Sequence, residues 1–212
     1  FVIVFIDPDE LPDIYGDRAF PINYPNAWDK RHGRTGYGIW LHGTPSRTYS
    51  RPPQDSNGCV IVSNDDLNTL MPFIDEGQTP VIIADEISWI TKQEWKQRRA
   101  AYEMFVEQWR QDWESRNVDL YLRHYSTDYS GLGKDYKSWV EYKRRVNPSK
   151  KFIRVNLSNT SMFMYPGEQQ LMVVTFTQDY KSDNFKRKFN KRQYWRMEDD
   201  GQWRIIYEGA AS

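Results

Sequence analysis

The sequence predicts two domains, a mainly β domain over residues 1–90 and an α+β domain over residues 91–212. Three observations predict this division. Before residue 90, short apolar runs are separated by Gly, Pro, Asn and Asp, the residues that typically end strands. After residue 91, a long helical pattern is followed by strands, an order typical of an α+β domain. The charge changes too, because residues 1–91 carry a net charge of −7 and residues 92–212 carry +7.

Composition excludes several classes of protein. The 212 residues carry no net charge, and 39% of them are hydrophobic, which is enough for a packed core and excludes intrinsic disorder. No stretch approaches the roughly 18 apolar residues of a membrane span, so none is expected. The single Cys excludes an internal disulfide framework and a Cys-rich zinc site. The chain opens inside an apolar run without Met or signal peptide, so we expect a processed chain, an excised domain or a fragment.

The first domain is expected to contain short strands and one helix. The apolar runs predict strands at Phe1–Ile6, Ile39–Leu41, Val60–Val62 and Val81–Ile83. A helix should begin at Ser63 or Asn64, since either side chain can cap it. Asp65 and Asp66 then fall in its first turn, and we interpret them as capping charges rather than catalysts.

The second domain is expected to begin with a long helix over Glu94–Arg116. Its apolar residues recur at helical spacing: Tyr102, Phe105, Val106, Trp109 and Trp113. Shorter helices are expected at Val118–Tyr125 and Tyr136–Val146. Strands are predicted to follow at Phe152–Leu157, Leu171–Tyr180, Phe185–Met197 and Trp203–Glu208.

Several aromatic and polar residues of this domain have two interpretations. The aromatic set favours a core over a sugar-stacking platform; it consists of Trp109, Trp113, Tyr121, Tyr125 and Trp195. The basic run Lys181–Arg192 predicts the polar face of a hairpin, and the alternative is a contact with anionic glycan or wall carboxylates. A separate active site would have to use scattered residues, which argues against it; these are His124, Asp119, Asp128 and Glu208.

Cys59 is a candidate nucleophile in the segment Ser56-Asn57-Gly58-Cys59. Most free cysteines are small buried hydrophobes, which is the alternative. Gly58 lets the backbone turn tightly before Cys59, which can present the sulfur and leave amide N–H groups for an oxyanion. The unperturbed thiol pKa near 8.5 is too high for efficient attack at neutral pH, so a neighbouring base is needed.

The base has three candidates, because the chain contains three histidines. His42 ends a short apolar run and precedes Gly43, so its ring can face a cleft. His32 lies in a polar run and is expected in an exposed loop. His124 follows Leu120 and Tyr121 on a predicted helix, which indicates a structural residue.

The pairing of His42-Gly43 with Ser56-Asn57-Gly58-Cys59 resembles the active-site signature of L,D-transpeptidases of the YkuD type. Residues 19–26 and 33–43 extend the resemblance to the branch that includes the peptidoglycan-trimming L,D-carboxypeptidases of helical bacteria. The resemblance covers roughly residues 1–88. It makes Cys59 the expected nucleophile.

The resemblance implies acyl transfer through a Cys59 thioester, without metal or nucleotide cofactor. His42 would serve as base and then acid. The carbonyl of Gly43 would orient His42, and the N–H groups of Gly58 and Cys59 would hold the oxyanion. The substrate would be a peptidoglycan stem tetrapeptide, cleaved after its third residue, meso-diaminopimelate. An amine acceptor would give a crosslink, whereas water would give a tripeptide.

The sequence departs from this family's pattern at two positions. The usual His before Gly-Cys is Asn57 here, which can hydrogen-bond but cannot exchange a proton near neutral pH. Ile61 stands where an Arg often follows the Cys. The family's catalytic sheet also usually begins upstream of Phe1.

Substrate contacts are expected from the residues around His42 and Cys59. Ser56 and Asn57 belong to the motif itself. Tyr37 and Trp40 could line a peptide groove with Tyr24, although aromatic residues at strand ends are more often core. The segment Thr44–Asp55 is expected to be a flexible lid, and within it Arg47 or Arg51 could hold a substrate carboxylate, with solvated charges as the alternative.

The second domain resembles the nuclear transport factor 2-like fold, a cone formed by a curved sheet wrapped on helices. The resemblance rests on three segments, which are the Trp-rich helix, residues 121–129 and residues 203–208. The same L,D-carboxypeptidase branch carries such a domain. We therefore expect a peptidoglycan-modifying enzyme of the bacterial periplasm or cell envelope, with a wall or protein partner for the basic domain. The alternative is a non-catalytic wall-binding or scaffolding protein. Nucleic acid is not expected as a partner, because no groove-reading motif is present.

Overall fold

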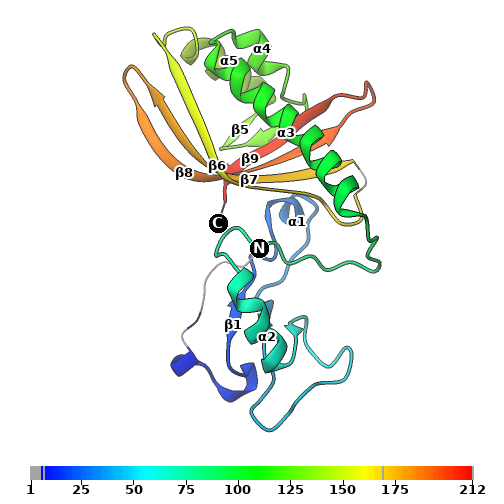
Figure 1. The fold of residues 1–212 in the computed structure, drawn as a ribbon. Coiled ribbons are helices and arrows are strands. Elements are labelled where there is room, and N and C mark those ends of the chain that lie inside the picture. The colour runs from blue at the N-terminus through cyan, green and yellow to red at the C-terminus, as the bar shows by residue number, and fades with distance from the viewer. Residues whose placement is uncertain (1–5, 7, 169, 212) are drawn as a thin grey trace. The chain divides into compact units, whose positions relative to one another are not determined.

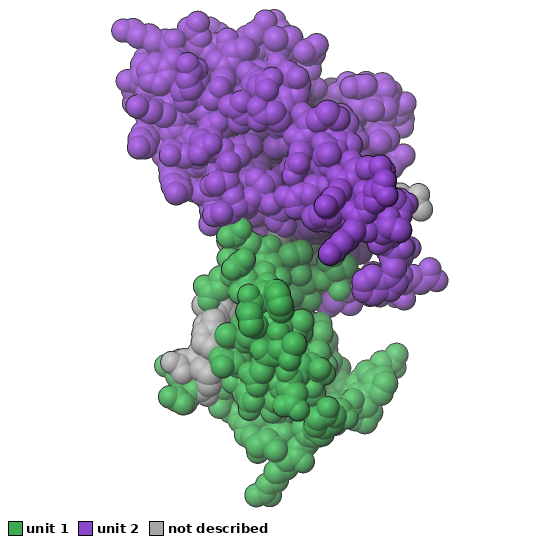
Figure 2. All heavy atoms as spheres, viewed as in Figure 1, with its two compact units in different colours: residues 1–82, 212 green, residues 83–211 purple. Residues whose placement is uncertain are grey.

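A computed structural model describes residues 6, 8–168 and 170–211 of the chain. It divides into two compact units, residues 1–82 with residue 212, and residues 83–211 (Figure 2).

The first unit contains a small three-stranded sheet of order β1-β2-β3. Its strands are β1 (Ala19–Pro21), β2 (Trp40–His42) and β3 (Val60–Ile61); β1 and β2 pair antiparallel, and β2 and β3 pair parallel. The helices are α1 (Ala27–Arg31) and α2 (Asn64–Leu70), with short 3₁₀ turns η1 (Pro8–Glu10), η2 (Asp13–Tyr15) and η3 (Met71–Phe73). Phe20, Leu41 and Leu67 form a buried cluster between sheet and α2.

The structure corrects two predictions in this unit. Val81–Ile83 forms no strand; Val81 packs against the buried cluster, but its backbone has no strand partner among the described residues. Helix α1 is missing from the predictions because only five residues form it, stabilised by a capping box between Asn26 and Asp29. Of the predicted strand Phe1–Ile6, residues 1–5 lie outside the described residues, and Ile6 forms a single bridge to Ala19.

The start of α2 agrees with the sequence. Ser63 is the N-cap, and its hydroxyl accepts a hydrogen bond from Asp66 N at 3.1 Å. Asp65 and Asp66 lie in the first turn, where negative charge is favourable. Asn64 is therefore the first helical residue rather than the cap.

The second unit is a curved antiparallel sheet of order β6-β7-β8-β9 with α3 lying across it (Figure 1). Its elements are α3 (Lys92–Glu114), α4 (Val118–Leu122), β4 (Ser130–Gly131), β5 (Lys134–Asp135), α5 (Tyr136–Val146), β6 (Ile153–Met164), β7 (Leu171–Ser182), β8 (Lys186–Met197) and β9 (Trp203–Ala210). All the aromatic residues predicted as core are buried, namely Trp109, Trp113, Tyr121, Tyr125 and Trp195.

Three predictions in this unit need correction. Helix α4 ends at Leu122 instead of Tyr125, because Ser126 N bonds to Ile205 O and Tyr125 forms a bridge to Ile205. Strand β6 extends to Met164, past a bulge between Ser158 and Ser161 that interrupts its alternation. The short strands β4 and β5 were not predicted, since two residues carry no periodicity.

The basic run Lys181–Arg192 is only partly the polar face of a hairpin. Lys181, Lys186, Arg187 and Lys188 are exposed, as predicted. Lys191 and Arg192 are buried, which corrects the prediction for these two residues. Lys191 Nζ lies 2.8 Å from Glu208 Oε1, so the interior provides this ammonium with an ion-pair partner.

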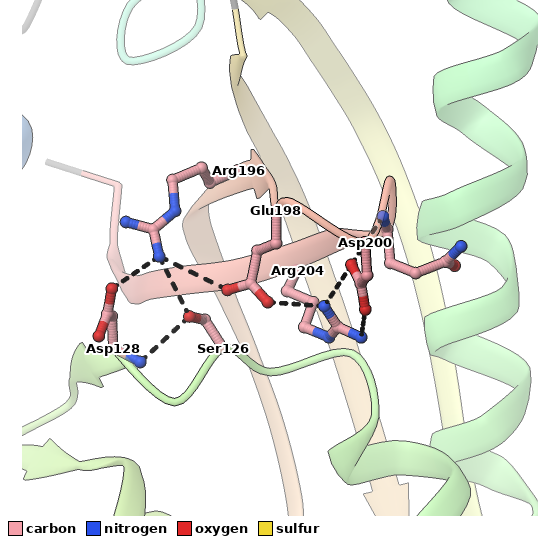
Figure 3. A network of polar contacts seen from close by, with 7 residues as sticks. Ser126, Asp128, Arg196, Glu198, Asp200 and Arg204 are labelled. Atoms are coloured by element: carbon pink, nitrogen blue, oxygen red, sulfur yellow. Dashed lines mark hydrogen bonds and ion pairs between the residues drawn. The ribbon is translucent and has the colours of Figure 1, made fainter.

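A charged network joins the turn before β4 to the β8–β9 hairpin (Figure 3). Arg196 pairs with Asp128 at 2.7 Å, and Arg204 pairs with Glu198 at 2.6 Å and with Asp200 at 2.7 Å. Most of these side chains are partly exposed, so water and salt screen the pairs and each contributes little to stability.

Candidate active site

His42 and Cys59 lie on neighbouring parallel strands. His42 ends β2, and Cys59 directly precedes β3. The register sets Leu41 opposite Val60 and His42 opposite Ile61. Cys59 lies outside β3, two positions before Ile61, the residue opposite His42. An extended backbone over these positions would put Cys59 on the face of the sheet that His42 occupies, with Cα atoms about 8 Å apart from strand spacing and rise. A histidine and a cysteine side chain together can bridge that separation.

The ring of His42 is buried and oriented by the backbone. Only 3% of His42 is exposed. Its Nδ1 lies 2.7 Å from Gly43 O, and because a carbonyl can only accept, Nδ1 carries the proton. The Nε2 lone pair is then available to take a proton. This is the contact with Gly43 that the resemblance implies.

Burial lowers the pKa of His42 below its ordinary value. The hydrogen bond to Gly43 acts in the opposite direction, and the positive charge of Arg51 lowers the pKa further. A neutral imidazole at neutral pH is the form that a general base requires.

Tyr15 packs against this histidine, and the sequence contains no signal that predicts it. Its ring lies 5.2 Å from the His42 ring in an edge contact and 4.7 Å from the Trp40 ring. Its carbonyl accepts a hydrogen bond from Gly43 N at 3.0 Å. Tyr15 lies in a short 3₁₀ turn without periodicity, so only the folded chain shows this contact.

The turn before Cys59 requires glycine. Gly58 has φ +109°, and a Cβ there would lie 2.6 Å from Ile39 Cδ1. Ser56 fastens the turn, since its hydroxyl donates to Cys59 O at 2.8 Å and accepts from Gly58 N at 3.3 Å. An oxyanion at Gly58 N–H would therefore replace a long hydrogen bond. Cys59 is half-buried, and its Sγ lies 3.7 Å from Gly38 O.

The other predicted substrate-binding residues differ in how far they are exposed. Trp40 is half-buried against Tyr15, whereas Tyr37 is 92% exposed. Arg51 pairs with Asp55 at 2.9 Å, and its positive charge is one of the causes that lower the pKa of His42. Arg47 and Asn57 are exposed.

Of the four scattered polar residues of the second unit, Asp119 and His124 line one cavity together with Asp112, and Asp128 and Glu208 are not among its lining residues. Asp119 pairs with Arg144, and Asp128 pairs with Arg196, both near the surface. His124 Nε2 lies 2.7 Å from Asp112 Oδ2. Glu208 lies in the interior instead.

A buried polar cluster surrounds Glu208, and the sequence pattern did not predict it. The carboxylate is 1% exposed and accepts hydrogen bonds from Lys191, Gln193 and Tyr125. Lys143 Nζ lies 4.4 Å from the Trp139 ring centre, and burial lowers its pKa to about 7. The polar residues of this cluster alternate with apolar residues along their strands and helices. A polar residue on the solvent face gives the same pattern, so local periodicity could not show that these residues are buried.

Neither a metal site nor a membrane span is found in the part of the chain that the structure describes. Its His, Cys, Asp and Glu side chains form no group of three that could hold an ion. No helix there has both the length and the apolar character that crossing a membrane requires.

Comparison with known proteins identifies both units. The L,D-transpeptidase catalytic domain family matches residues 3–83, and the Cds6 C-terminal NTF2-like domain family matches residues 102–209. The structure of Bd1075 from Bdellovibrio bacteriovorus is 33% identical, with a TM-score of 0.81, and the match covers 98% of this chain and 74% of that chain. No curated protein matches the chain.

A second solved structure shows the same fold. The helical cell shape determining protein Pgp2 from Campylobacter jejuni is 22% identical, with a TM-score of 0.72. The match covers 98% of this chain and 72% of that chain. Both resemblances expected from the sequence are confirmed. The chain belongs to the L,D-transpeptidase family, and its catalytic domain is followed by an NTF2-like domain.

Proposed function

We propose that this chain is a peptidoglycan-modifying cysteine enzyme that cuts the bond between meso-diaminopimelate and D-alanine in stem tetrapeptides. One observation carries the proposal. His42 is held by Gly43 O with Nε2 left as the basic nitrogen, and it ends β2, whose parallel neighbour β3 begins directly after Cys59. A cysteine nucleophile needs a base in that place.

The reaction forms and then breaks a thioester. His42 Nε2 takes the proton from Cys59 Sγ, and the thiolate attacks the carbonyl carbon of diaminopimelate. The C–N bond to D-alanine breaks, and His42 returns the proton to the leaving amine. Water then attacks the thioester to give a tripeptide, or an amine of a second stem peptide attacks it to give a crosslink. In both cases the Cys59 thiol is regenerated.

The developing negative charge requires donors next to Cys59. The N–H groups of Gly58 and Cys59 supply them, once the Ser56 hydroxyl gives up its 3.3 Å contact with Gly58 N. Arg51, whose charge acts on His42, is the preferred partner for a substrate carboxylate, and Arg47 is the second candidate. Trp40 and Tyr37 would line the stem peptide, with Asn57 at the rim.

The setting of the reaction is the bacterial cell wall. Family membership supports action in the periplasm or envelope. Pgp2 is described as determining helical cell shape, and we propose a related role in wall shape for this chain. The second unit then contributes binding to the wall or to a protein partner, for which its exposed basic strand ends are available.

The test compares the protein with its Cys59→Ala variant on disaccharide-tetrapeptide, with the products read by mass spectrometry. We expect disaccharide-tripeptide or a crosslinked dimer from the wild type alone. Tripeptide would identify a carboxypeptidase and dimer a transpeptidase. If neither protein gives product, the enzyme proposal fails. Retention of residues 1–212 on purified sacculi would then support the alternative, a non-catalytic wall-binding protein.

A further inference from the structure

A carboxamide outside the His–Cys pair holds the peptide unit next to His42. Asn64 is the first residue of α2. Its Oδ1 accepts hydrogen bonds from Thr44 N at 3.1 Å and from Asp17 N at 3.2 Å. Its Nδ2 donates to Thr44 O at 2.9 Å. The amide therefore uses both of its ends, and two of the three contacts go to Thr44.

These contacts act on the carbonyl that orients His42. Gly43 C=O and Thr44 N–H belong to one planar peptide unit. Asn64 accepts from the N–H of that unit at 3.1 Å, while His42 Nδ1 donates to its oxygen at 2.7 Å. The plane is thus held at both ends. A hydrogen bond accepted from the N–H also polarises the carbonyl, which strengthens its bond to His42.

The backbone leaves space for this carboxamide. A Cβ on Gly43 would collide with Asn64 Oδ1, and so would a Cβ on Gly16. Gly16 also has φ +69°, a conformation that favours glycine. The close approach of Asn64 therefore requires glycine at position 43. The hydrogen bond to His42 does not, because any residue at this position would supply a backbone carbonyl.

We propose that Asn64 is a positioning residue of the active site. Through the Gly43–Thr44 peptide, it fixes the carbonyl that keeps His42 in the tautomer with its Nε2 lone pair available to Cys59. The inference rests on the proposed function for its effect on catalysis, whereas the tautomer of His42 can be measured independently.

The competing role for Asn64 is to fasten α2 to the rest of the unit. Asn68, one turn later on the same helix, provides the matched control. It accepts from Arg18 Nε at 3.0 Å and donates to Asp17 Oδ2 at 3.2 Å, and neither of these contacts is with the Gly43–Thr44 peptide. If Asn64 only fastened α2 to the rest of the unit, substitutions of Asn64 and Asn68 should have the same effect on catalysis.

The kinetic test compares Asn64→Ala, Asn64→Asp and Asn68→Ala with the wild type. A displaced general base can cost about 100-fold, so we expect Asn64→Ala to lower kcat about 10- to 100-fold with KM unchanged. Asn64→Asp keeps an oxygen for Thr44 N and should recover part of kcat. Asn68→Ala should retain wild-type kcat.

The spectroscopic test uses ¹⁵N-histidine labelling, which gives only three ring systems in this chain. In the wild type, His42 should show a protonated Nδ1, and in Asn64→Ala it should become a mixture of tautomers. His124, held by Asp112, reports whether the variant is folded. If Asn64→Ala does not fold, Asn64→Ser takes its place, because the shorter side chain cannot span the same contacts.

The outcomes separate this inference from the proposed function. A folded Asn64→Ala protein with wild-type kcat, or with His42 in a single Nδ1–H tautomer, would overturn the positioning role. Equal losses in Asn64→Ala and Asn68→Ala would also overturn it, in favour of docking. Absence of activity in the wild type would instead refute the proposed function, while the tautomer measurement would still decide the role of Asn64.

Discussion

The two units of this protein hold their functional polar groups in different ways. In the first, the buried cluster of Phe20, Leu41 and Leu67 is small, and His42 is oriented by backbone carbonyls. In the second, charged side chains such as Lys191 and Glu208 lie inside a core rich in Trp and Tyr.

The difference teaches where each unit is sensitive to substitution. In the first unit, the position of His42 depends on glycines and on short hydrogen bonds to the backbone. Substitutions there should therefore lower catalysis more than they lower stability. Charged groups inside an aromatic core are tolerated only when paired, so their loss should affect stability first. The predictions that follow separate these two behaviours.

The largest expected effect is that of His42→Gln on catalysis. Removing a general base typically costs 10²- to 10⁴-fold, so kcat/KM should fall by about that factor. His32→Gln is the matched control, because His32 is exposed and bonds to Trp28 O at the end of α1. Comparable activity in the two variants would remove His42 from the mechanism.

The same residue gives a pH dependence. Burial lowers the pKa of His42, so the neutral base persists below its ordinary pKa of 6.5. The acidic limb of kcat/KM against pH should therefore lie below 6.5, and activity should fall only as pH drops through this lowered value. A midpoint above 6.5 would contradict the role of burial.

The next effect is on stability and concerns the buried ion pair. Lys191→Met leaves the Glu208 carboxylate buried without its nearest cation, and breaking such a pair costs about 3–5 kcal/mol. Urea unfolding of the second unit should show this loss. Lys186→Met, at the exposed start of the same strand, should change stability by less than about 0.5 kcal/mol. Equal midpoints for the two variants would show that the pair contributes nothing.

A smaller effect concerns Lys143 and appears only as a pH dependence. Burial lowers its pKa from 10.5 to about 7, with Glu208 opposing the shift and Lys191 adding to it. Between these two values the unfolded chain binds a proton that the folded chain has released. Stability should therefore rise with pH from 7 toward 10, and Lys143→Met should remove that slope. An unchanged slope in denaturation series at pH 7, 8 and 9 would contradict this assignment.

Long periodic elements could be predicted from the sequence because one face of each is buried along its whole length. Helix α5 has the predicted bounds, and α3 differs from its prediction by two residues at each end. Short elements such as α1 and β4 depend on capping or on distant pairing, which local periodicity does not show.

The residues of the candidate site also differ in whether the sequence could predict them. His42, Gly43 and Cys59 carry a motif and could be proposed from it. Tyr15 accepts a hydrogen bond from Gly43 N, and Asn64 accepts one from Thr44 N. They lie 28 and 21 residues away from Gly43, and neither has a sequence pattern of its own. Lys191 was expected at the surface, since a strand's alternation does not reveal which face contains an ion-pair partner.

The most direct test of the central claim is to look for the acyl group on Cys59. The wild-type protein is mixed with disaccharide-tetrapeptide, quenched in acid within one turnover and measured as an intact protein, with the adduct located by peptide mapping. We predict a disaccharide-tripeptide adduct on Cys59 that hydroxylamine removes. Tripeptide release by the Cys59→Ala variant at the wild-type rate, with no adduct on the wild type, would contradict the claim.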